Sequence, residues 1–252
     1  MEQMRKQVLY FSAKSFLEKG YTTTTVREIS KLADINLGSV LNLFKTKEDI
    51  LAALVKYVLE GQFQTTAELL KDKTDDKILF YATETTLQLY MAESSEHIQD
   101  IYKSAYSLTA TTDMIQQTIT HKLEEIFKPS LPNLETKDFF ELEIASGGIM
   151  RGFLTVPCNM YFTMERKIKR FLETTFKLYD VSKEKIDEVV RFVSGFDFEA
   201  IAKKTVLGML DYLDKSKLVV TCTALKFLIS VRILAVTIKV LRVVAFRAHK
   251  MI

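Results

Sequence analysis

The sequence predicts an all-α protein in which a small three-helix head precedes a larger helical domain. Only 8 Gly and 3 Pro occur in 252 residues, too few for a turn-rich β architecture, whereas Leu, Lys, Glu and Ala are abundant. Apolar residues recur at helical spacing along most of the chain. Side chains that cap helices precede several of these apolar patterns. A chain of this length can also bury a core without disulfide bonds.

Composition narrows the classes of function. Cys158 and Cys222 have no CxxC partner, which argues against a disulfide framework or a zinc knuckle and fits a reducing cytoplasm. The charged start, Met1–Lys6, leads into no apolar run, so we expect no secretory signal. The net charge is +3, yet residues 1–214 carry 27 basic and 32 acidic groups, a net charge of −5. If nucleic acid is the partner, contact must come from a small local surface.

The first helix is predicted from about Gln3 to Lys19. Val8, Phe11 and Phe16 belong to a broad apolar face along this segment. Gly20 should end the helix, because glycine readily takes the positive φ of a C-terminal cap. The chain therefore begins with one amphipathic helix that can cover the core of a small head.

Two short helices joined by a tight turn follow. Thr25 and Glu28 stand at the spacing of a capping box, which predicts a second helix at Val26–Leu32. A four-residue turn ends at Asn36, and this residue is a good cap for a third helix, Leu37–Phe44. Helix pairs of this shape can enter the major groove of DNA.

A fourth helix is expected to begin after Thr46 and to continue to about Leu70. The acids Glu48 and Asp49 suit the positive end of its dipole. Lys47 would then be free to reach a phosphate. This helix would link the head to the rest of the chain.

These residues resemble the tetracycline-repressor (TetR/AcrR) family of regulators, in order and in spacing over about a fifth of the chain. The resemblance implies a homodimer in which each subunit places its third helix in the major groove of a palindromic operator. It also implies a helix-turn-helix head at 1–50, followed by a helical ligand-binding and dimerisation domain at 51–214. The matching residues are Phe16-Leu17-Glu18-Lys19-Gly20-Tyr21, Thr24-Thr25-Val26-Arg27-Glu28-Ile29, Ala33, Ile35, Gly38-Ser39 and Phe44-Lys45-Thr46-Lys47-Glu48-Asp49-Ile50.

Eight residues of the head are candidates for contact with double-stranded DNA. Leu37, Ser39 and Asn42 are expected to face base edges, because Asn can pair with adenine and Leu can touch a thymine methyl group. Thr25 and Asn36 are explained equally well as helix caps. Contacts with phosphates are expected from Tyr21, Thr24, Thr25, Asn36 and Lys47.

Two positions depart from the family pattern. The family usually carries an aromatic residue where Leu41 stands, and Tyr or His where Leu43 stands, so two donors to the DNA backbone are missing. This leaves two hypotheses open. The first is a ligand-responsive regulator, most simply a repressor, in which ligand moves two recognition helices away from the roughly 34 to 36 Å that successive major grooves require. The alternative is a regulator-fold interaction or membrane-surface protein with weakened DNA binding.

The larger domain should consist of further helices and hold the ligand. Its apolar residues predict helices at 76–93, 95–109, 111–127, 137–155, 159–179, 183–194 and 197–213. Its aromatic and Met side chains could line a cavity for a small apolar ligand, although at helical spacing they fit an ordinary core equally well. The candidate ligand contacts are Tyr81, Tyr90, Tyr102, Tyr106, Met114, Met150 and Phe153.

Dimerisation is expected through the last helices before Asp214. Ala145, Gly147 and Gly148 form a small-residue patch that could allow close packing.

Signals for an enzyme are thin. Of the three histidines, His97, His121 and His249, the first two each have one acidic residue four positions away, at helical spacing. A metal site needs three or four converging ligands. The sequence contains no GxSxG, P-loop, GxGxxG or HExxH pattern. We therefore expect no catalytic site, no metal site and no cofactor.

Residues 215–252 form a basic apolar tail of uncertain status. It has eight basic residues and no acidic one, and its longest uncharged run, Leu218–Leu225, is far shorter than the roughly 20 residues that span a bilayer. A basic amphipathic helix on anionic lipid, a terminal packing helix and an extension from an altered reading frame are the alternatives. Nothing else in the sequence points to a membrane.

Overall fold

The computed structural model describes residues 1–211, which contain helices and no strand. The all-α prediction is confirmed, and the tail predicted at 215–252 lies outside the described residues. The helices are α1 (Glu2–Lys19), α2 (Val26–Leu32), α3 (Leu37–Leu43), α4 (Lys47–Leu70), α5 (Lys77–Glu93), α6 (Glu96–Ala105), α7 (Thr109–Phe127), α8 (Thr136–Thr155), α9 (Met164–Leu178) and α10 (Lys183–Val193), followed by a helical segment at 198–211.

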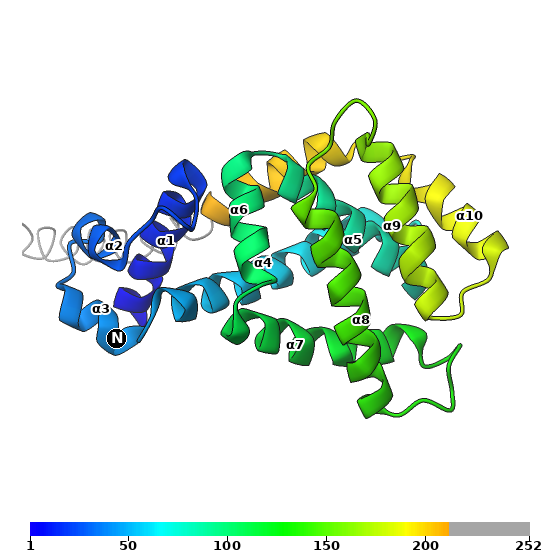
Figure 1. Ribbon diagram of the computed structural model, residues 1–252, viewed down its shortest axis with the longest axis horizontal. Coiled ribbons are helices and arrows are strands. Elements are labelled where there is room, and N and C mark those ends of the chain that lie inside the picture. Colours follow the sequence, from blue (N-terminus) through cyan, green and yellow to red (C-terminus); the bar gives the residue numbers. More distant parts are fainter. Residues whose placement is uncertain (212–252) are drawn as a thin grey trace, which may run out of the picture. The chain divides into compact units, whose positions relative to one another are not determined.

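The head consists of α1, α2 and α3 together with the first turns of α4 (Figure 1). The predicted caps are present: Thr25 forms a capping box with Glu28, Asn36 caps α3, and Thr46 caps α4. Gly20 ends α1 with a φ of 85°. The end of α1 and the starts of α2, α3 and α4 therefore lie at the predicted capping residues. The buried apolar core of the head is Val8, Phe16, Ile29, Ala33, Val40, Phe44, Ile50 and Leu51.

The larger domain is built around α5. The 24-residue helix α4 runs from the head into this domain without a break, as Figure 1 shows. Helix α5 contacts α4, α6, α7, α8, α9 and α10, and almost every residue from Leu79 to Ala92 is buried. Tyr81 on α5 packs edge-on against Phe127 and Phe176. Because α5 is enclosed on all sides, its polar side chains must find partners within the protein.

Helix boundaries differ from the prediction mainly where side chains build turns. The helix expected at 159–179 begins only at Met164, because Asn159 Oδ1 accepts hydrogen bonds from the amides of Tyr161 and Phe162 at 2.8 and 3.0 Å. Thr163 then caps α9. Helix α6 ends at Ala105, four residues before the predicted end.

A buried ion pair fastens the segment between α8 and α9 to α5. The side chain of Lys167 is 0% exposed, and its Nζ lies 2.5 Å from Glu93 Oε1 and 2.6 Å from the carbonyl oxygen of Val156. Glu93 Oε2 also accepts a hydrogen bond from the amide of Cys158 at 3.1 Å. The Lys167–Glu93 pair therefore links α9 and the segment before it to the end of α5.

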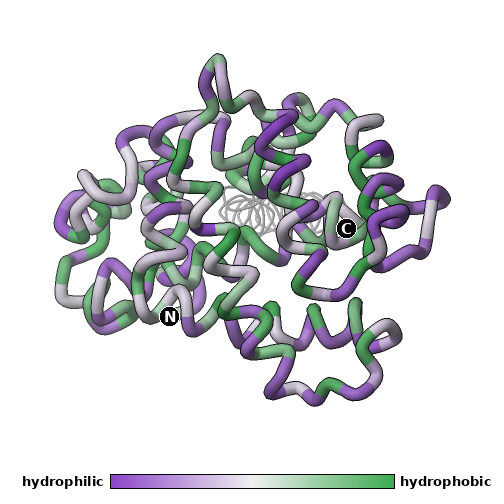
Figure 2. The backbone as a smooth tube through the Cα atoms, turned by 45° about the vertical axis from the view of Figure 1, so that its right-hand side comes forward, coloured by the Kyte–Doolittle hydropathy of each residue, from purple (hydrophilic) through white to green (hydrophobic). Residues whose placement is uncertain are grey.

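Hydrophobic and hydrophilic residues alternate in short stretches along the backbone, as Figure 2 shows. Within residues 1–211, no helix has the length and apolar character needed to cross a bilayer.

Candidate functional site

One face of α3 packs into the core of the head, and the opposite face lies at the surface. Val40 is fully buried, and Phe44, directly after α3, is 2% exposed. The side chain of Asn36 accepts a hydrogen bond from the amide of Ser39 at 2.8 Å, which fixes the start of the helix. The residues on the outer side, which are exposed or half-buried, are Asn36, Leu37, Gly38, Ser39, Leu41 and Asn42.

The start of α2 is tied to the end of α1 by charge. Glu28 accepts hydrogen bonds from Lys19 Nζ at 2.8 Å and from the amide of Thr25 at 2.9 Å. These hydrogen bonds, from Lys19 first and then Thr25, lower the pKa of Glu28 to about 2. Thr25 is exposed and its hydroxyl remains at the surface of the head.

Three predicted phosphate contacts point into the protein instead. Lys47 Nζ donates to the carbonyl oxygens of Tyr21 and Thr24 at 2.9 Å each, and it lies 4.2 Å from the centre of the Tyr21 ring. Desolvation by burial lowers the pKa of Lys47. Thr24 is 1% exposed and its hydroxyl donates to the carbonyl oxygen of Gly20 at 2.8 Å. In this conformation Tyr21, Thr24 and Lys47 hold the turn between α1 and α2, and none of them extends toward a phosphate.

Sequence reasoning missed other cations on this side of the head. Arg27, Lys31 and Lys45 are exposed on α2 and on the residue that follows the C-cap of α3. The signal was available, because Arg27 and Lys31 lie on the outward side of the predicted second helix. These three side chains are exposed, whereas Lys47 Nζ is bound to backbone carbonyl groups.

A joint connects the head to α6. Asp100 Oδ2 accepts a hydrogen bond from the amide of Thr22 at 2.8 Å, and its Oδ1 accepts one from the Thr22 hydroxyl at 2.7 Å. A Cβ atom on Gly20 would lie 2.8 Å from Asp100 Oδ2, so only glycine leaves room for this approach. His97 Nδ1 lies 3.1 Å from the carbonyl oxygen of Leu17. Helix α6 therefore holds the end of α1 and the turn that follows.

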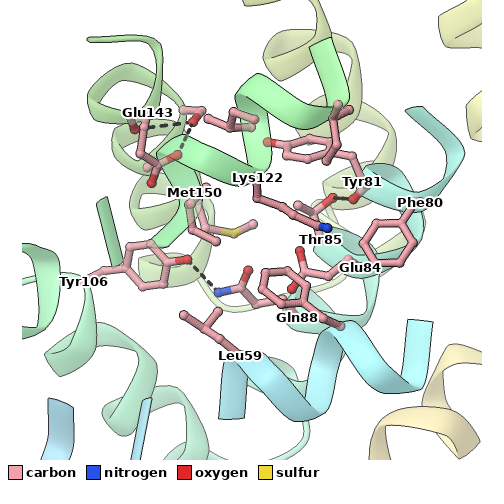
Figure 3. Close-up of a pocket in the computed structure, with 16 residues that line it drawn as sticks. Leu59, Phe80, Tyr81, Glu84, Thr85, Gln88, Tyr106, Lys122, Glu143 and Met150 are labelled. Carbon is pink, nitrogen blue, oxygen red and sulfur yellow. Dashed lines mark hydrogen bonds between the residues drawn. The ribbon is translucent and has the colours of Figure 1, made fainter. Parts of the chain in front are cut away.

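A cavity lies inside the larger domain between α4, α5, α7 and α8 (Figure 3). Only about 40 Å³ of it is open to a water-sized sphere, so the cavity is narrow. A hollow at the surface shares Phe80, Lys122 and Ile126 with it, which places these residues at the opening. The polar lining of the cavity consists of Tyr81, Glu84, Thr85, Gln88, Tyr106, Lys122, Glu143 and Ser146.

Two buried glutamates dominate the chemistry of this cavity. Glu84 is 6% exposed and Glu143 is 4% exposed. Burial raises the pKa of Glu84 to about 8. Burial also raises the pKa of Glu143 to about 8, with the charge of Glu84 acting in the same direction and a hydrogen bond from Ser146 acting against it. The Ser146 hydroxyl donates to Glu143 Oε2 at 2.9 Å, whereas Glu84 Oε1 has no hydrogen-bond partner among the described residues.

Comparison with known proteins identifies the head. Residues 11–54 match the family model described as "Bacterial regulatory proteins, tetR family". This segment belongs to the tetR family. The match contains α2, α3 and the capped start of α4.

Relatives of the tetR-family head carry regulator names. The chain is 37% identical over 60 residues to "HTH-type transcriptional regulator HbdR" of Aromatoleum sp. (strain CIB), which covers 24% of this chain and 26% of that protein. It is 26% identical over 156 residues to "Probable HTH-type transcriptional regulator YttP" of Bacillus subtilis (strain 168), covering 61% and 69% of the two chains. A third relative, "Uncharacterized HTH-type transcriptional regulator YvkB" of the same organism, is 28% identical over 131 residues, covering 49% and 60%. The matched part thus spans about a quarter of HbdR and just over two thirds of YttP.

The residues predicted to contact ligand are only partly brought together. Tyr81, Tyr106 and Met150 line the cavity. The other four lie elsewhere because aromatic residues in this domain also build its core. Tyr90 stacks on Phe198, Tyr102 accepts a hydrogen bond from Gln62 at 2.7 Å, Met114 contacts Thr118, and Phe153 packs against Phe162 and Phe171.

Sequence reasoning missed the polar part of the cavity. Glu84 and Gln88 lie one turn apart on α5, within the run Thr83-Glu84-Thr85-Thr86-Leu87-Gln88. A run of polar residues flanked by apolar ones on both sides is the signal that could have indicated a polar site inside a buried helix. Within residues 1–211, no group of three or more His, Cys, Asp or Glu side chains is arranged to hold a metal ion.

Proposed function

We propose that this chain is a ligand-responsive transcriptional regulator that binds a palindromic operator as a homodimer and acts as a repressor. The observation that carries the proposal is the tetR-family head, in which α3 packs against α2 and leaves its outer side exposed or half-buried. A short helix presented in this way can enter the major groove. The partner of the head is then double-stranded DNA.

Base recognition is assigned to the outer face of α3. Asn42 is exposed and can make a bidentate pair with adenine. Ser39 and Leu37 flank it on the half-buried side, and Leu41, which is 41% exposed, can touch a thymine methyl group. Lys45, Arg27 and Thr25 are assigned to the phosphates on either side of the groove.

Ligand response is assigned to the path from the cavity through α6 to the head. Tyr106 lies directly after α6, and its hydroxyl accepts a hydrogen bond from Gln88 Nε2 inside the cavity at 2.7 Å. Asp100, on the same helix, holds the amide of Thr22 in the head. A ligand that displaces Tyr106 moves α6, and α6 cannot move without disturbing Asp100. Ligand and operator would then weaken each other's binding by the same factor.

The homodimer is assigned to the outer face of α8. Ile144 is 50% exposed and Phe140 is 39% exposed, and a Cβ atom added to Gly148 would meet nothing within 4 Å. These residues lie on one side of the helix at four-residue spacing, so a second copy of α8 could approach closely. Gly147, the neighbour of Gly148 in the small-residue patch, lines the cavity and is not part of this face.

Selection of random duplexes by the purified protein tests the DNA-binding proposal and reports half-site symmetry. Asn42→Ala should relax the preference at one base position per half-site. Lys45→Ala should weaken binding to all sequences and reduce the salt slope by about one. Lys169→Ala, on the exposed side of α9, serves as the matched control. If no sequence is enriched and sheared DNA is not retained, the alternative of an interaction protein on the same fold takes its place.

Hydrogen exchange tests the joint independently of any ligand. Asp100→Ala removes the acceptor of the Thr22 amide, so that amide should exchange at least tenfold faster. The amide of Glu28, which is held by the Thr25 hydroxyl, should be unchanged. Equal protection of the Thr22 amide in both proteins would contradict the assigned role of α6.

A further inference from the structure

The exposed side of α3 carries no charge. From Asn36 to Phe44 the sequence contains no Asp, Glu, Lys or Arg, and the nearest charged residues are Asp34 in the preceding turn and Lys45 after the helix. Figure 1 shows α3 at the edge of the head. The commonest contact with guanine comes from Arg or Lys, which reaches both acceptors on the major-groove edge of that base. Helix α3 therefore has no side chain for this contact.

Leucine supplies the apolar surface of the outer face of α3. Leu37 and Leu41 are four residues apart, so they lie on one side of the helix. Leu37 is half-buried and Leu41 is 41% exposed, while Val40 and Phe44 fill the core on the inner side. A single leucine at a surface needs no explanation, but these two form one stripe on a helix shaped to enter the major groove. Thymine alone among the four bases presents an apolar group there, its C5 methyl group.

The polar side chains of the same face are neutral. Asn42 is exposed next to Leu41, and its amide can both donate to and accept from the major-groove edge of adenine. Ser39 is half-buried, and its hydroxyl adapts to any base. An A·T pair offers the adenine edge and the thymine methyl group together, so this pair matches the whole face.

Gly38 is not required by the fold. It is exposed in the first turn of α3, and its φ is not positive. Beyond its chain neighbours and the helix backbone, a Cβ atom at this position would meet only Asn36 Oδ1, at 3.4 Å, among the described residues. Because glycine destabilises a helix relative to alanine, its presence here points outside the head. The missing side chain leaves room for a surface that approaches α3 closely.

We propose that α3 reads an operator half-site of A·T pairs through thymine methyl groups. Leu37 and Leu41 lie against two of these methyl groups, and Asn42 pairs with an adjacent adenine. Gly38 lets the helix come close to the base edges. This inference rests on the proposed DNA binding and names the sequence class of the operator. Lys45, assigned to a phosphate, adds affinity that does not depend on sequence.

The methyl group can be changed without changing the shape of the duplex. Uracil is thymine without its C5 methyl group, and 5-methylcytosine carries the same group on a different base. Replacing one contacted thymine by uracil should weaken binding about fourfold, because burial of one methyl group contributes about that factor. The same change in both half-sites should weaken binding about fifteenfold. Where cytosine replaces the thymine, 5-methylcytosine should recover about fourfold of the loss.

Titration of the full chain with the selected duplex and its uracil forms measures these ratios. Leu41→Ala should weaken binding to the thymine duplex about fourfold and make the protein indifferent to uracil at one position of each half-site. Leu207→Ala removes a leucine that is 55% exposed in the segment at 198–211. This matched control should keep the wild-type sensitivity to uracil. Equal sensitivity of Leu41→Ala and wild type at every thymine would refute the assignment of Leu41.

Gly38→Ala tests the close approach of α3 by separating stability from binding. Gly208→Ala is the matched control, because Gly208 is also exposed in a helical segment and a Cβ atom there would meet nothing within 4 Å among the described residues. Both variants should raise the urea midpoint of unfolding slightly. Only Gly38→Ala should weaken DNA binding, by about tenfold, because an added methyl group overfills a close contact. Unchanged DNA binding by Gly38→Ala would show that α3 does not approach the bases at this point.

The outcomes separate this inference from the proposed function. If the selected half-site is defined by G·C pairs, or if uracil at every thymine leaves binding unchanged, thymine recognition is wrong and the regulator stands. If no sequence is selected and sheared DNA is not retained, the proposed function and this inference are both wrong.

Discussion

Replacing Glu84 by Gln should make the protein more stable at alkaline pH. The unfolded chain loses the Glu84 proton near pH 4.5, whereas the folded protein holds it to a pH of about 8. Because the folded state binds more protons between these values, wild-type stability falls as the pH rises from about 4.5 to about 8 and is then constant with respect to this group. Glutamine has no charge to desolvate, so the variant avoids this loss.

The magnitude follows from the pKa difference. The difference between about 4.5 and about 8 corresponds to about 5 kcal/mol, which is an upper limit because relaxation and water penetration lower the cost of burying a charge in a protein. We expect Glu84→Gln to raise the free energy of unfolding by about 2 to 4 kcal/mol near pH 9 and to change it little near pH 5.

Urea unfolding followed by circular dichroism measures this difference. Glu141→Gln, whose side chain is exposed on α8, should show no pH-dependent gain. The difference in unfolding free energy between Glu84→Gln and wild type could instead be the same at pH 5 and pH 9. That result would show that Glu84 is not an enclosed, protonated acid and would refute the assignment of the cavity as a buried acidic site.

Three further changes test the joint and the buried pair. Gly20→Ala should lower the unfolding free energy by about 1 to 3 kcal/mol, because its φ of 85° strains an L residue and the Cβ atom meets α6. Gly208→Ala, with open space around its Cβ atom, should be neutral or slightly stabilising in the same urea titration. Lys47→Met should lower the unfolding free energy by about 1 to 3 kcal/mol and leave the salt slope of DNA binding unchanged, because the Lys47 ammonium group donates to backbone carbonyl groups. A salt slope reduced by one would show that Lys47 contacts a phosphate. Glu93→Ala should lower the unfolding free energy by about 3 kcal/mol and shift the urea midpoint down, because it leaves the Lys167 ammonium group buried without its carboxylate. An unchanged midpoint would mean that the ammonium group is solvated.

Local chemistry made the head predictable. Capping residues act within three or four positions along the chain, so Thr25, Asn36 and Thr46 indicated the starts of α2, α3 and α4, and the structure confirms all three caps. Ser182 likewise begins α10, accepting a hydrogen bond from the amide of Lys185. The periodicity of apolar residues then indicated which side of each helix faces inward.

Contacts between distant residues could not be predicted in the same way. Lys47 was assigned to a phosphate because a cation at a helix start is usually solvated, and the carbonyl groups that it binds lie 26 and 23 positions away along the chain. The cavity draws residues from α4, α5, α7 and α8, and aromatic side chains are equally common in cores. A buried glutamate is rare, so the polar run on α5 was the better guide to the site than the tyrosines and methionines.

The segment from Gly20 to Thr24 lies between α6 and α4 and is bound to both. On one side Asp100 of α6 binds the amide and hydroxyl of Thr22, and on the other Lys47 of α4 binds the carbonyl groups of Tyr21 and Thr24. Burial, Glu48 and Asp100 together raise the pKa of Tyr21 to about 12, so its ring stays neutral between these charges. Because Thr25, the next residue, caps α2, a shift of α6 relative to α4 would disturb the start of the helix against which α3 packs.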